Sequence, residues 1–437
     1  MNRNDQCKSL NQNTMKTKLL FTWLIISLSA LAGEPQLTEC APRGGLPNFF
    51  AKLEHGDTVP IGYLGGSITA QQGWRPKSLN WFQQQYPKAK ISEIAAAIGG
   101  TGSDLGAFRL KQDVLNRKPD LVFVEFAVND GDGPPEPIYR GMEGIVRQVW
   151  RNNPDTDICF VYTVDLNKLK ALQAGKLPNS YANMDKVAEH YGIPTIIMGL
   201  EVARLEQTGK LIFKGAKPTT DEEKAKLGDK IIFSPDGVHP YTDSGHQLYF
   251  EALVRGMNLI KPVGQPGPHK LIEPLIADNW ENAQMLPMNL AKLSAGWKKL
   301  DPATDPQAKA FSSRMPGGLW EANQPGDSIE FKFRGTAASI YDVIGPGCGQ
   351  VMITLDDKTP EVKPLFDVYC TSYRLFRLNI GSGLSNTMHT VKIEIHPDQP
   401  DKAKILGERN KKMDDPKRFD DRIFYAGAVM IVGELVE

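Results

Sequence analysis

The stretch VPIGYLGGSIT, Val59–Thr69, decides the fold because a short apolar run ends there in two glycines and a serine. An apolar run bounded by Pro and Gly is typical of a buried parallel strand, and the glycines mark the turn after it. Ser67 stands where this strand would give way to a helix. Alone, such a serine is most often a helix N-cap or a turn residue, so its role depends on the segments that meet it.

Further apolar runs of the same kind alternate with stretches of helical spacing up to about residue 257. They are AKISEIAA (89–96), DLVFVEFAV (120–128), DICFVYTV (157–164) and IPTIIMG (193–199). Strand and helix repeated five times predict an open parallel sheet with helices on both faces. A polar segment at 209–230 interrupts the last unit and is expected to be an insertion, either a lid near the site or a solvated loop.

The chain changes character after Ile260, where a Pro/Gly-rich connector begins and the helical period largely disappears. Short β-like runs separated by Gly, Pro, Asp and Asn follow, and they predict an all-β sandwich. The length of 437 residues also suits two folded domains rather than one core. We expect a signal peptide at 1–32, a lead-in at 33–57, an α/β domain at 58–262, a linker at 263–285 and the β-sandwich domain at 286–437.

The N-terminus reads as an export signal. Lys16 and Lys18 precede an apolar run from Leu19 to Leu31, and the small-x-small pattern Ala30-Leu31-Ala32 suits cleavage before Gly33. The alternative is a membrane anchor, but the run is short for a bilayer, so we expect no integral membrane domain. The protein is therefore expected in the periplasm or outside the cell.

Charge and cysteine content exclude several classes of protein. The 51 basic and 51 acidic residues cancel, which leaves no electrostatic footprint for nucleic acid. There is no C-x-x-C motif, so a structural zinc or thiol redox site has no support. Export permits disulfides, and Cys348 and Cys370 could pair, although the sequence alone does not establish that bond.

Residues of the kinds used in acyl transfer follow four of the predicted strands. They are Ser67, the glycine-rich AIGGTGSD (97–104), Asn129, and the pair Asp236 and His239. In an open parallel sheet, ligands bind at the carboxyl ends of the strands. A serine nucleophile needs a base, the base needs an orienting group, and the oxyanion needs hydrogen-bond donors. Each segment alone could be a simple turn, but four at one sheet edge favour a catalytic site.

The set GGSIT, GGTGSD, AVND and DGVHP, in that order, resembles the blocks of the SGNH (GDSL-type) hydrolase family over about residues 58–260. The resemblance implies a flavodoxin-like, five-stranded parallel sheet. It also implies that Ser67 is the nucleophile, His239 the base and Asp236 its orienting group. The oxyanion donors would be the N–H groups of Ser67 and Gly100 and the side-chain amide of Asn129. No cofactor is implied.

Two positions depart from the family pattern. Gly66 stands where the first block usually has Asp, and Ala127 stands where the third block usually has Gly. Neither change removes a catalytic group, and together they indicate a divergent branch.

Two residues near the nucleophile are candidates for substrate binding. Trp74 would stack on a sugar ring and Arg75 would hold a polar group, although an aromatic residue there can equally belong to the core. A metal site is the alternative for Asp236 and His239, but no third His or Cys lies at ligand spacing, so we expect no metal.

The sequence therefore predicts an exported serine esterase that removes ester groups, chiefly O-acetyl groups, from a carbohydrate or polysaccharide. The C-terminal runs resemble the galactose-binding-like jelly rolls that accompany carbohydrate-active enzymes. That domain would bind glycan or only complete the active-site wall. The alternatives are a carbohydrate O-acyltransferase and a non-catalytic glycan-binding protein on a hydrolase scaffold.

Overall fold

The computed structural model describes residues 37–315 and 317–436. The expected signal peptide lies outside the described residues. Across the residues described, no helix is both long and apolar enough to cross a membrane.

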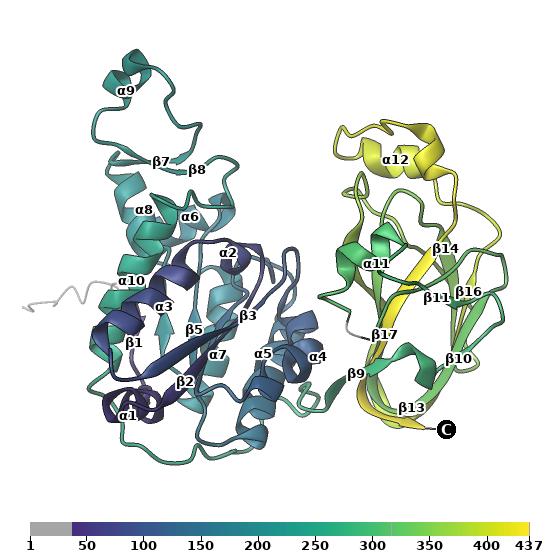
Figure 1. Cartoon of the computed structure of the whole chain (residues 1–437), viewed down its shortest axis with the longest axis horizontal. Coiled ribbons are helices and arrows are strands. Elements are labelled where there is room, and N and C mark those ends of the chain that lie inside the picture. Colours follow the sequence, from purple (N-terminus) through teal and green to yellow (C-terminus); the bar gives the residue numbers. More distant parts are fainter. Residues whose placement is uncertain (1–36, 316, 437) are drawn as a thin grey trace, which may run out of the picture. The chain divides into compact units, whose positions relative to one another are not determined.

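The N-terminal part is built on a parallel sheet whose strands coincide with the five apolar runs of the sequence (Figure 1). They are β2 (Thr58–Gly65), β3 (Lys90–Ala97), β4 (Leu121–Glu125), β5 (Asp157–Val161) and β6 (Thr195–Ile196). Their spatial order is β3-β2-β4-β5-β6, the order of a flavodoxin-like fold. The predicted fold class is confirmed, and the strand order reverses between β2 and β4.

The sheet has one strand more than predicted. Strand β1 (Cys40–Ala41) pairs antiparallel with β6 and makes the sheet six-stranded. Two residues are too few to leave a periodic pattern in the sequence, which is why this edge strand was not predicted.

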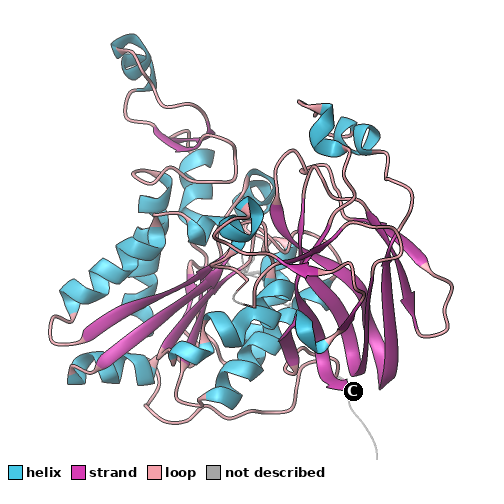
Figure 2. Ribbon diagram, turned by 45° about the vertical axis from the view of Figure 1, so that its right-hand side comes forward, coloured by secondary structure: helices cyan, strands magenta, loops and turns pink. Residues whose placement is uncertain are grey.

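Helices cover both faces of the sheet (Figure 2). Helix α4 packs on α5 and α5 on α7, while α10 packs on α3 and α8, so the helices form two separate groups. The helices of this part are α1 (Pro47–His55), α2 (Ser67–Ala70), α3 (Trp74–Gln85), α4 (Ser103–Asp113), α5 (Pro135–Asn152), α6 (Leu166–Gln173), α7 (Asn179–Tyr191), α8 (Leu200–Gln207) and α10 (Gly245–Ile260).

The predicted insertion at 209–230 contains one strand and a short helix, and its strand pairs with the strand that follows the insertion. Strands β7 (Leu211–Lys214) and β8 (Ile231–Ser234) pair, and α9 (Asp221–Leu227) lies beyond them (Figure 1). Helix α9 begins with a capping box at Thr220 and has no buried residue. The base of the insertion is held by a hydrogen bond from the Gly215 N–H to the Ser234 carbonyl (2.9 Å). The insertion therefore leads directly into the segment that carries Asp236.

The connector after α10 packs against the α/β part through stacking and polar contacts. The His269 ring stacks on Trp150 at 4.6 Å between centroids and contacts the buried Asp157 carboxylate at 2.7 Å. Further along, the Ile276 N–H donates to the buried carboxylate of Glu143 (2.9 Å). Although the Pro/Gly composition reads as a linker, these contacts fix the segment against the surface.

The C-terminal part is an antiparallel β-sandwich-like domain, as predicted (Figure 2). Its elements are β9 (Ala283–Pro287), β10 (Lys292–Leu293), β11 (Lys298–Lys299), α11 (Pro306–Phe311), β12 (Trp320–Ala322), β13 (Ser328–Ile344), β14 (Gln350–Leu355), β15 (Glu361–Pro364), β16 (Arg374–Ile395), α12 (Lys402–Gly407) and β17 (Phe424–Val436). The long strands β13 and β17 change partners along their length, with register shifts near Gly335. Such changes let one connected sheet turn a corner.

The cysteines of the described residues are free thiols. Cys348 and Cys370 are both buried and unpaired; the Cys348 thiol contacts the Val343 carbonyl and the Cys370 thiol contacts Asp367. The structure thus leaves the possible disulfide between them unformed.

Candidate active site

The nucleophile candidate sits at the switch point of the sheet. Strand β2 ends at Gly65, Gly66 is the N-cap of the single-turn helix α2, and Ser67 is the first helical residue. No side-chain capping bond is present at this N-cap. The Ser67 hydroxyl is therefore not a cap, and it points instead to a histidine from another segment.

Ser67, His239 and Asp236 form a continuous hydrogen-bonded chain. The Ser67 Oγ lies 2.8 Å from the His239 Nε2, and the His239 Nδ1 lies 2.7 Å from the Asp236 Oδ2. Because a carboxylate only accepts, the Nδ1 carries the ring proton and the Nε2 accepts from the serine hydroxyl. This is the arrangement that a serine needs to become a nucleophile at neutral pH.

The loop between β8 and α10 holds Asp236 in place. Its Oδ1 accepts from the N–H groups of Val238 (2.9 Å) and His239 (2.8 Å) and from the Ser234 hydroxyl (3.0 Å). Burial acts against the charge, but the hydrogen bonds from His239, Val238 and Ser234 outweigh it and hold the pKa of the Asp236 carboxyl well below its usual range. Asp236 is thus ionised wherever His239 has to work as a base.

Asn129 lies directly against the backbone beside the nucleophile. A Cβ built on Gly66 would come within 2.0 Å of the Asn129 Oδ1 and 2.7 Å of its Cγ. The Asn129 amide therefore occupies the space that any side chain at position 66 would need. The glycine in place of the family's Asp has a structural consequence, since it lets the Asn129 amide pack against the backbone of Gly66, next to Ser67 in the chain.

The glycine-rich turn after β3 reaches the same point. A Cβ on Gly99 would lie 3.5 Å from the Ser67 Cβ, and Gly100 has a φ of +74°, which favours glycine. The first turn of α4 follows, where the Ser103 N–H donates to the Asp130 Oδ1 (2.8 Å). The structure thus brings Ser67, Gly100 and Asn129 to one edge of the sheet, where sequence reasoning expected the oxyanion donors.

Asp130 is the last residue of the AVND block and follows Asn129 directly. Its Oδ2 is buried and without a hydrogen-bond partner among the described residues. Burial raises the pKa of the Asp130 carboxyl to about 7, against the hydrogen bond from Ser103. The carboxyl joins the Asn129 loop to the helix that follows the glycine turn.

A cleft of about 600 Å³ opens beside the glycine turn, and of its lining residues the sequence had indicated a site role only for Gly100. One wall comes from the turn and the start of α4, and the other comes from the C-terminal part. It is lined by Gly100, Thr101, Gly102, Asp104, Leu105, Tyr369, Arg374, Leu375, Phe376 and Arg377. The Arg377 guanidinium pairs with Asp104 at 2.9 Å and joins the two walls. No periodic pattern marks these residues, because they come from separate elements.

Trp74 and Arg75 do not line the site, and this corrects the expectation that they bind substrate. Trp74 is 1% exposed and its ring packs on Tyr63 and Phe123. Arg75 is 5% exposed; its Nε donates to the Thr69 carbonyl at 3.0 Å and its Nη1 pairs with Glu93. Both side chains belong to the packing of α3 and have no surface to offer a sugar.

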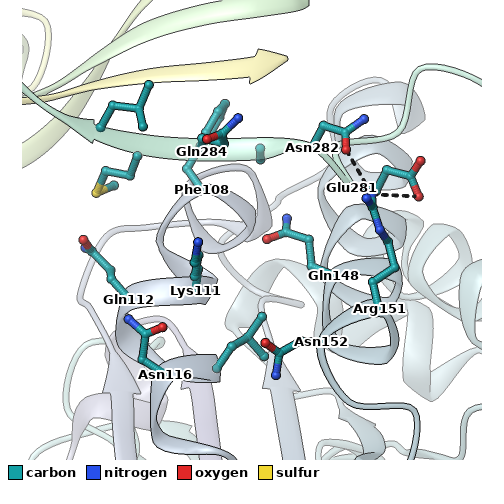
Figure 3. Close-up of a pocket in the computed structure, with 14 residues that line it drawn as sticks. Phe108, Lys111, Gln112, Asn116, Gln148, Arg151, Asn152, Glu281, Asn282 and Gln284 are labelled. Atoms are coloured by element: carbon teal, nitrogen blue, oxygen red, sulfur yellow. Dashed lines mark hydrogen bonds and ion pairs between the residues drawn. The ribbon is translucent and has the colours of Figure 1, made fainter. Parts of the chain in front are cut away.

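Another groove, of about 560 Å³, lies at the far end of α4 from Ser103 (Figure 3). Its walls include Lys111 and Gln112 of α4, Arg151 of α5 and Asn282 of the connector. Arg151 is already bonded to Asn282 at 2.9 Å. None of the candidate site residues lines this groove, whereas Gly100 lines the cleft beside the glycine turn, so the groove is separate from the candidate active site.

Known proteins resemble this chain in sequence motif and in fold. Residues 63–248 match the model of the GDSL-like lipase/acylhydrolase family. No curated protein matches the chain.

Among solved structures, a two-domain esterase active on acetylated mannans, crystallised with mannopentaose, is 20% identical with a TM-score of 0.69. The match covers 90% of this chain and 97% of that one. An acetylxylan esterase from Geobacillus stearothermophilus is 16% identical with a TM-score of 0.33, over 47% of this chain and 96% of that one. The likeness to the two-domain esterase shows that both parts of the chain share its fold. The chain therefore resembles the GDSL-like lipase/acylhydrolase family over residues 63–248, and it shares with the solved two-domain esterase a fold in which an α/β part is followed by an antiparallel β domain.

Proposed function

We propose that the protein hydrolyses O-acetyl esters on a carbohydrate through an acyl-enzyme on Ser67. The observation that carries the proposal is the Ser67–His239–Asp236 chain, with its contacts of 2.8 Å and 2.7 Å. Its position at the switch point of the parallel sheet is where ligands bind in this class of fold.

In the first half-reaction the Ser67 Oγ attacks the ester carbonyl while its proton passes to the His239 Nε2. The oxyanion is held by the N–H groups of Ser67 and Gly100 and by the Asn129 amide. His239 then returns the proton to the departing sugar hydroxyl. In the second half-reaction, water attacks the acetyl group with His239 again as base, and acetate leaves.

The carbohydrate part of the proposal rests on the cleft and on the fold. The cleft beside Gly100 has Tyr369 and Phe376 in its lining, and aromatic rings of this kind can contact a sugar ring. The Arg374 guanidinium lies over both rings, so it would have to share them with the sugar. The two-domain esterase of the same fold acts on acetylated mannans. We extend that substrate class to this protein and assign the cleft as the place where the acetylated chain lies.

Two further expectations from the sequence remain proposals. We propose export after cleavage before Gly33, which N-terminal sequencing of the secreted protein would test. We also keep the domain bounds 58–262 and 286–437, which limited proteolysis would test by the sites at which the chain is first cut.

The experiment that tests the function measures acetate release from a panel of acetylated polysaccharides by the wild type and Ser67→Ala. We expect release from at least one acetylated glycan and loss of about 10⁴-fold or more in the variant. Ser313→Ala, an exposed serine far along the chain, is the matched control and should keep full activity. Unchanged release by Ser67→Ala would overturn the serine mechanism.

A further inference from the structure

Glu125 is a buried carboxyl at the catalytic edge that the proposed mechanism does not use. It ends β4, four residues before Asn129, and is 0% exposed. No lysine, arginine or histidine pairs with it among the described residues. Placing a carboxyl in such a site costs free energy that an apolar side chain would not, so its presence calls for a specific role.

The partners of Glu125 come from three neighbouring strand ends. Its Oε2 accepts from the Thr69 hydroxyl of α2 at 2.9 Å, and its Oε1 accepts from the Thr163 hydroxyl after β5 at 2.7 Å. The Ala127 N–H, in its own loop, also donates to it. Burial raises the pKa of this carboxyl, and the three donors act against that rise. The three donors to this carboxyl all come from segments at the edge of the sheet that carries Ser67 and Asn129.

Two of these partners stand close in sequence to the groups that would hold the oxyanion. Thr69 is two residues after Ser67, and Ala127 is two residues before Asn129. Helix α2 has only four residues and no side-chain cap, so it cannot hold its own position and depends on tertiary contacts. The bond from Thr69 to Glu125 is such a contact, and Thr69 is itself 0% exposed.

We infer that Glu125 is a positioning residue that sets the distance between the Ser67 N–H and the Asn129 amide by fixing α2 and the Asn129 loop to one carboxyl. It touches neither the substrate nor the reacting atoms. The inference rests on the proposed function, because it concerns the oxyanion donors of that same site. Donors that are misplaced weaken the transition state more than the bound ester, since the oxyanion exists only after attack.

The test compares Glu125→Gln with Glu143→Gln. Glu143 is the matched control because it is equally buried, is bonded to the Tyr191 hydroxyl and to connector N–H groups, and lies away from the catalytic edge. We expect Glu125→Gln to lower kcat about tenfold with KM within twofold, and Glu143→Gln to leave kcat unchanged. Phenylboronic acid, which forms a tetrahedral adduct on a serine, should bind about tenfold more weakly to Glu125→Gln alone.

A second variant keeps the test decisive if Glu125→Gln does not fold. Thr69→Val deletes only the hydroxyl that Glu125 accepts, and it should lower kcat with KM retained. When both variants fold, their combination should cost no more than the larger single loss. A kcat within twofold of wild type in either variant, a loss confined to KM, or an equal loss in Glu143→Gln would overturn the inference. Ser67→Ala, run in parallel, separates this outcome from failure of the proposed function, because only the latter leaves that variant active.

Discussion

Two histidines seven residues apart both contact the segment that begins at Ser67, His239 from the loop after β8 and His246 from the first turn of α10. His239 has a half-exposed ring between a carboxylate and the Ser67 hydroxyl. His246 is 0% exposed, accepts from the Trp74 N–H at its Nδ1 (3.2 Å) and donates from its Nε2 to Gln71 (3.1 Å). The His239 ring is placed to exchange a proton with Ser67. The His246 ring connects α10 to Gln71 and Trp74 and has a structural role.

The difference between the two rings lies in their partners. A carboxylate at Nδ1 leaves the Nε2 of His239 free to accept and stabilises the cation that forms. A peptide N–H at the Nδ1 of His246 occupies its only acceptor, and burial lowers the pKa of that ring to about 4. Nearness to Ser67 therefore does not decide which histidine is the base. The group bonded to the ring Nδ1 decides it.

The largest expected effect on kcat comes from replacing each of these two histidines separately. His239→Ala should lower kcat by about 10⁴-fold or more, because the serine loses its base, while the thermal midpoint changes little. His246→Gln should keep kcat within about threefold and lower the midpoint, because a buried bridge is weakened. Ester hydrolysis and thermal unfolding of both variants check this. A loss of activity in His246→Gln as large as in His239→Ala would contradict the assignment of a purely structural role to His246.

The second prediction concerns acid stability and the depressed pKa of His246. The unfolded chain binds a proton near pH 6.5 and the folded ring only near pH 4, so this contribution is complete above pH 6.5 and is lost as the pH falls toward 4. A shift of this size corresponds to about 3 kcal/mol.

Urea unfolding at pH 7.5 and pH 4 measures that contribution. The wild type should lose about 3 kcal/mol more than His246→Gln over this interval, since glutamine does not titrate. Parallel losses in the two proteins would show that other groups govern acid unfolding.

The sequence predicted the strands, and it pointed to Ser67, His239 and Asp236, which lie in one hydrogen-bonded chain, because both leave local signatures. The first three apolar runs are followed by Ser67, Gly100 and Asn129, and the topology of a parallel sheet gathers these strand ends. His239 follows β8, which belongs to a separate two-stranded sheet, so its approach to Ser67 comes from tertiary packing. Trp74 was assigned wrongly because nearness in sequence to Ser67 was taken as nearness to substrate. Its spacing with Ser78 and Phe82, both buried on the same face of α3, was the available signal.

Other parts of the site had no signature in the sequence. Tyr369 and Phe376 reach the cleft through tertiary packing of the C-terminal part, which no local pattern describes. Glu125 alternates within a strand like any buried residue, and its meaning depends on Thr69 and Thr163 from other segments. The sequence indicates which residues follow the strands, whereas the contacts between those residues are seen only in the structure.

The smallest predicted effect concerns Gly66, the position that departs from the family pattern. Its φ of −92° suits alanine, so Gly66→Ala adds no backbone strain. The added Cβ would instead fall within 2.0 Å of the Asn129 Oδ1 and must displace that amide. We expect kcat to fall about tenfold, less than the roughly 10²-fold of Asn129→Ala, because a displaced donor still retains part of its effect.

The same change separates a displaced amide from a general disturbance of the loop. If Gly66→Ala acts only through Asn129, it should cost almost nothing further in a protein that already carries Asn129→Ala. Gly133→Ala is the matched control, because a Cβ there meets nothing within 4 Å. Full activity in Gly66→Ala would mean that the Asn129 amide can move aside and return during turnover. An equal loss of kcat in the wild-type and Asn129→Ala backgrounds would mean that Gly66 acts on Ser67 directly. The position of the Asn129 amide would then not explain the effect of Gly66→Ala.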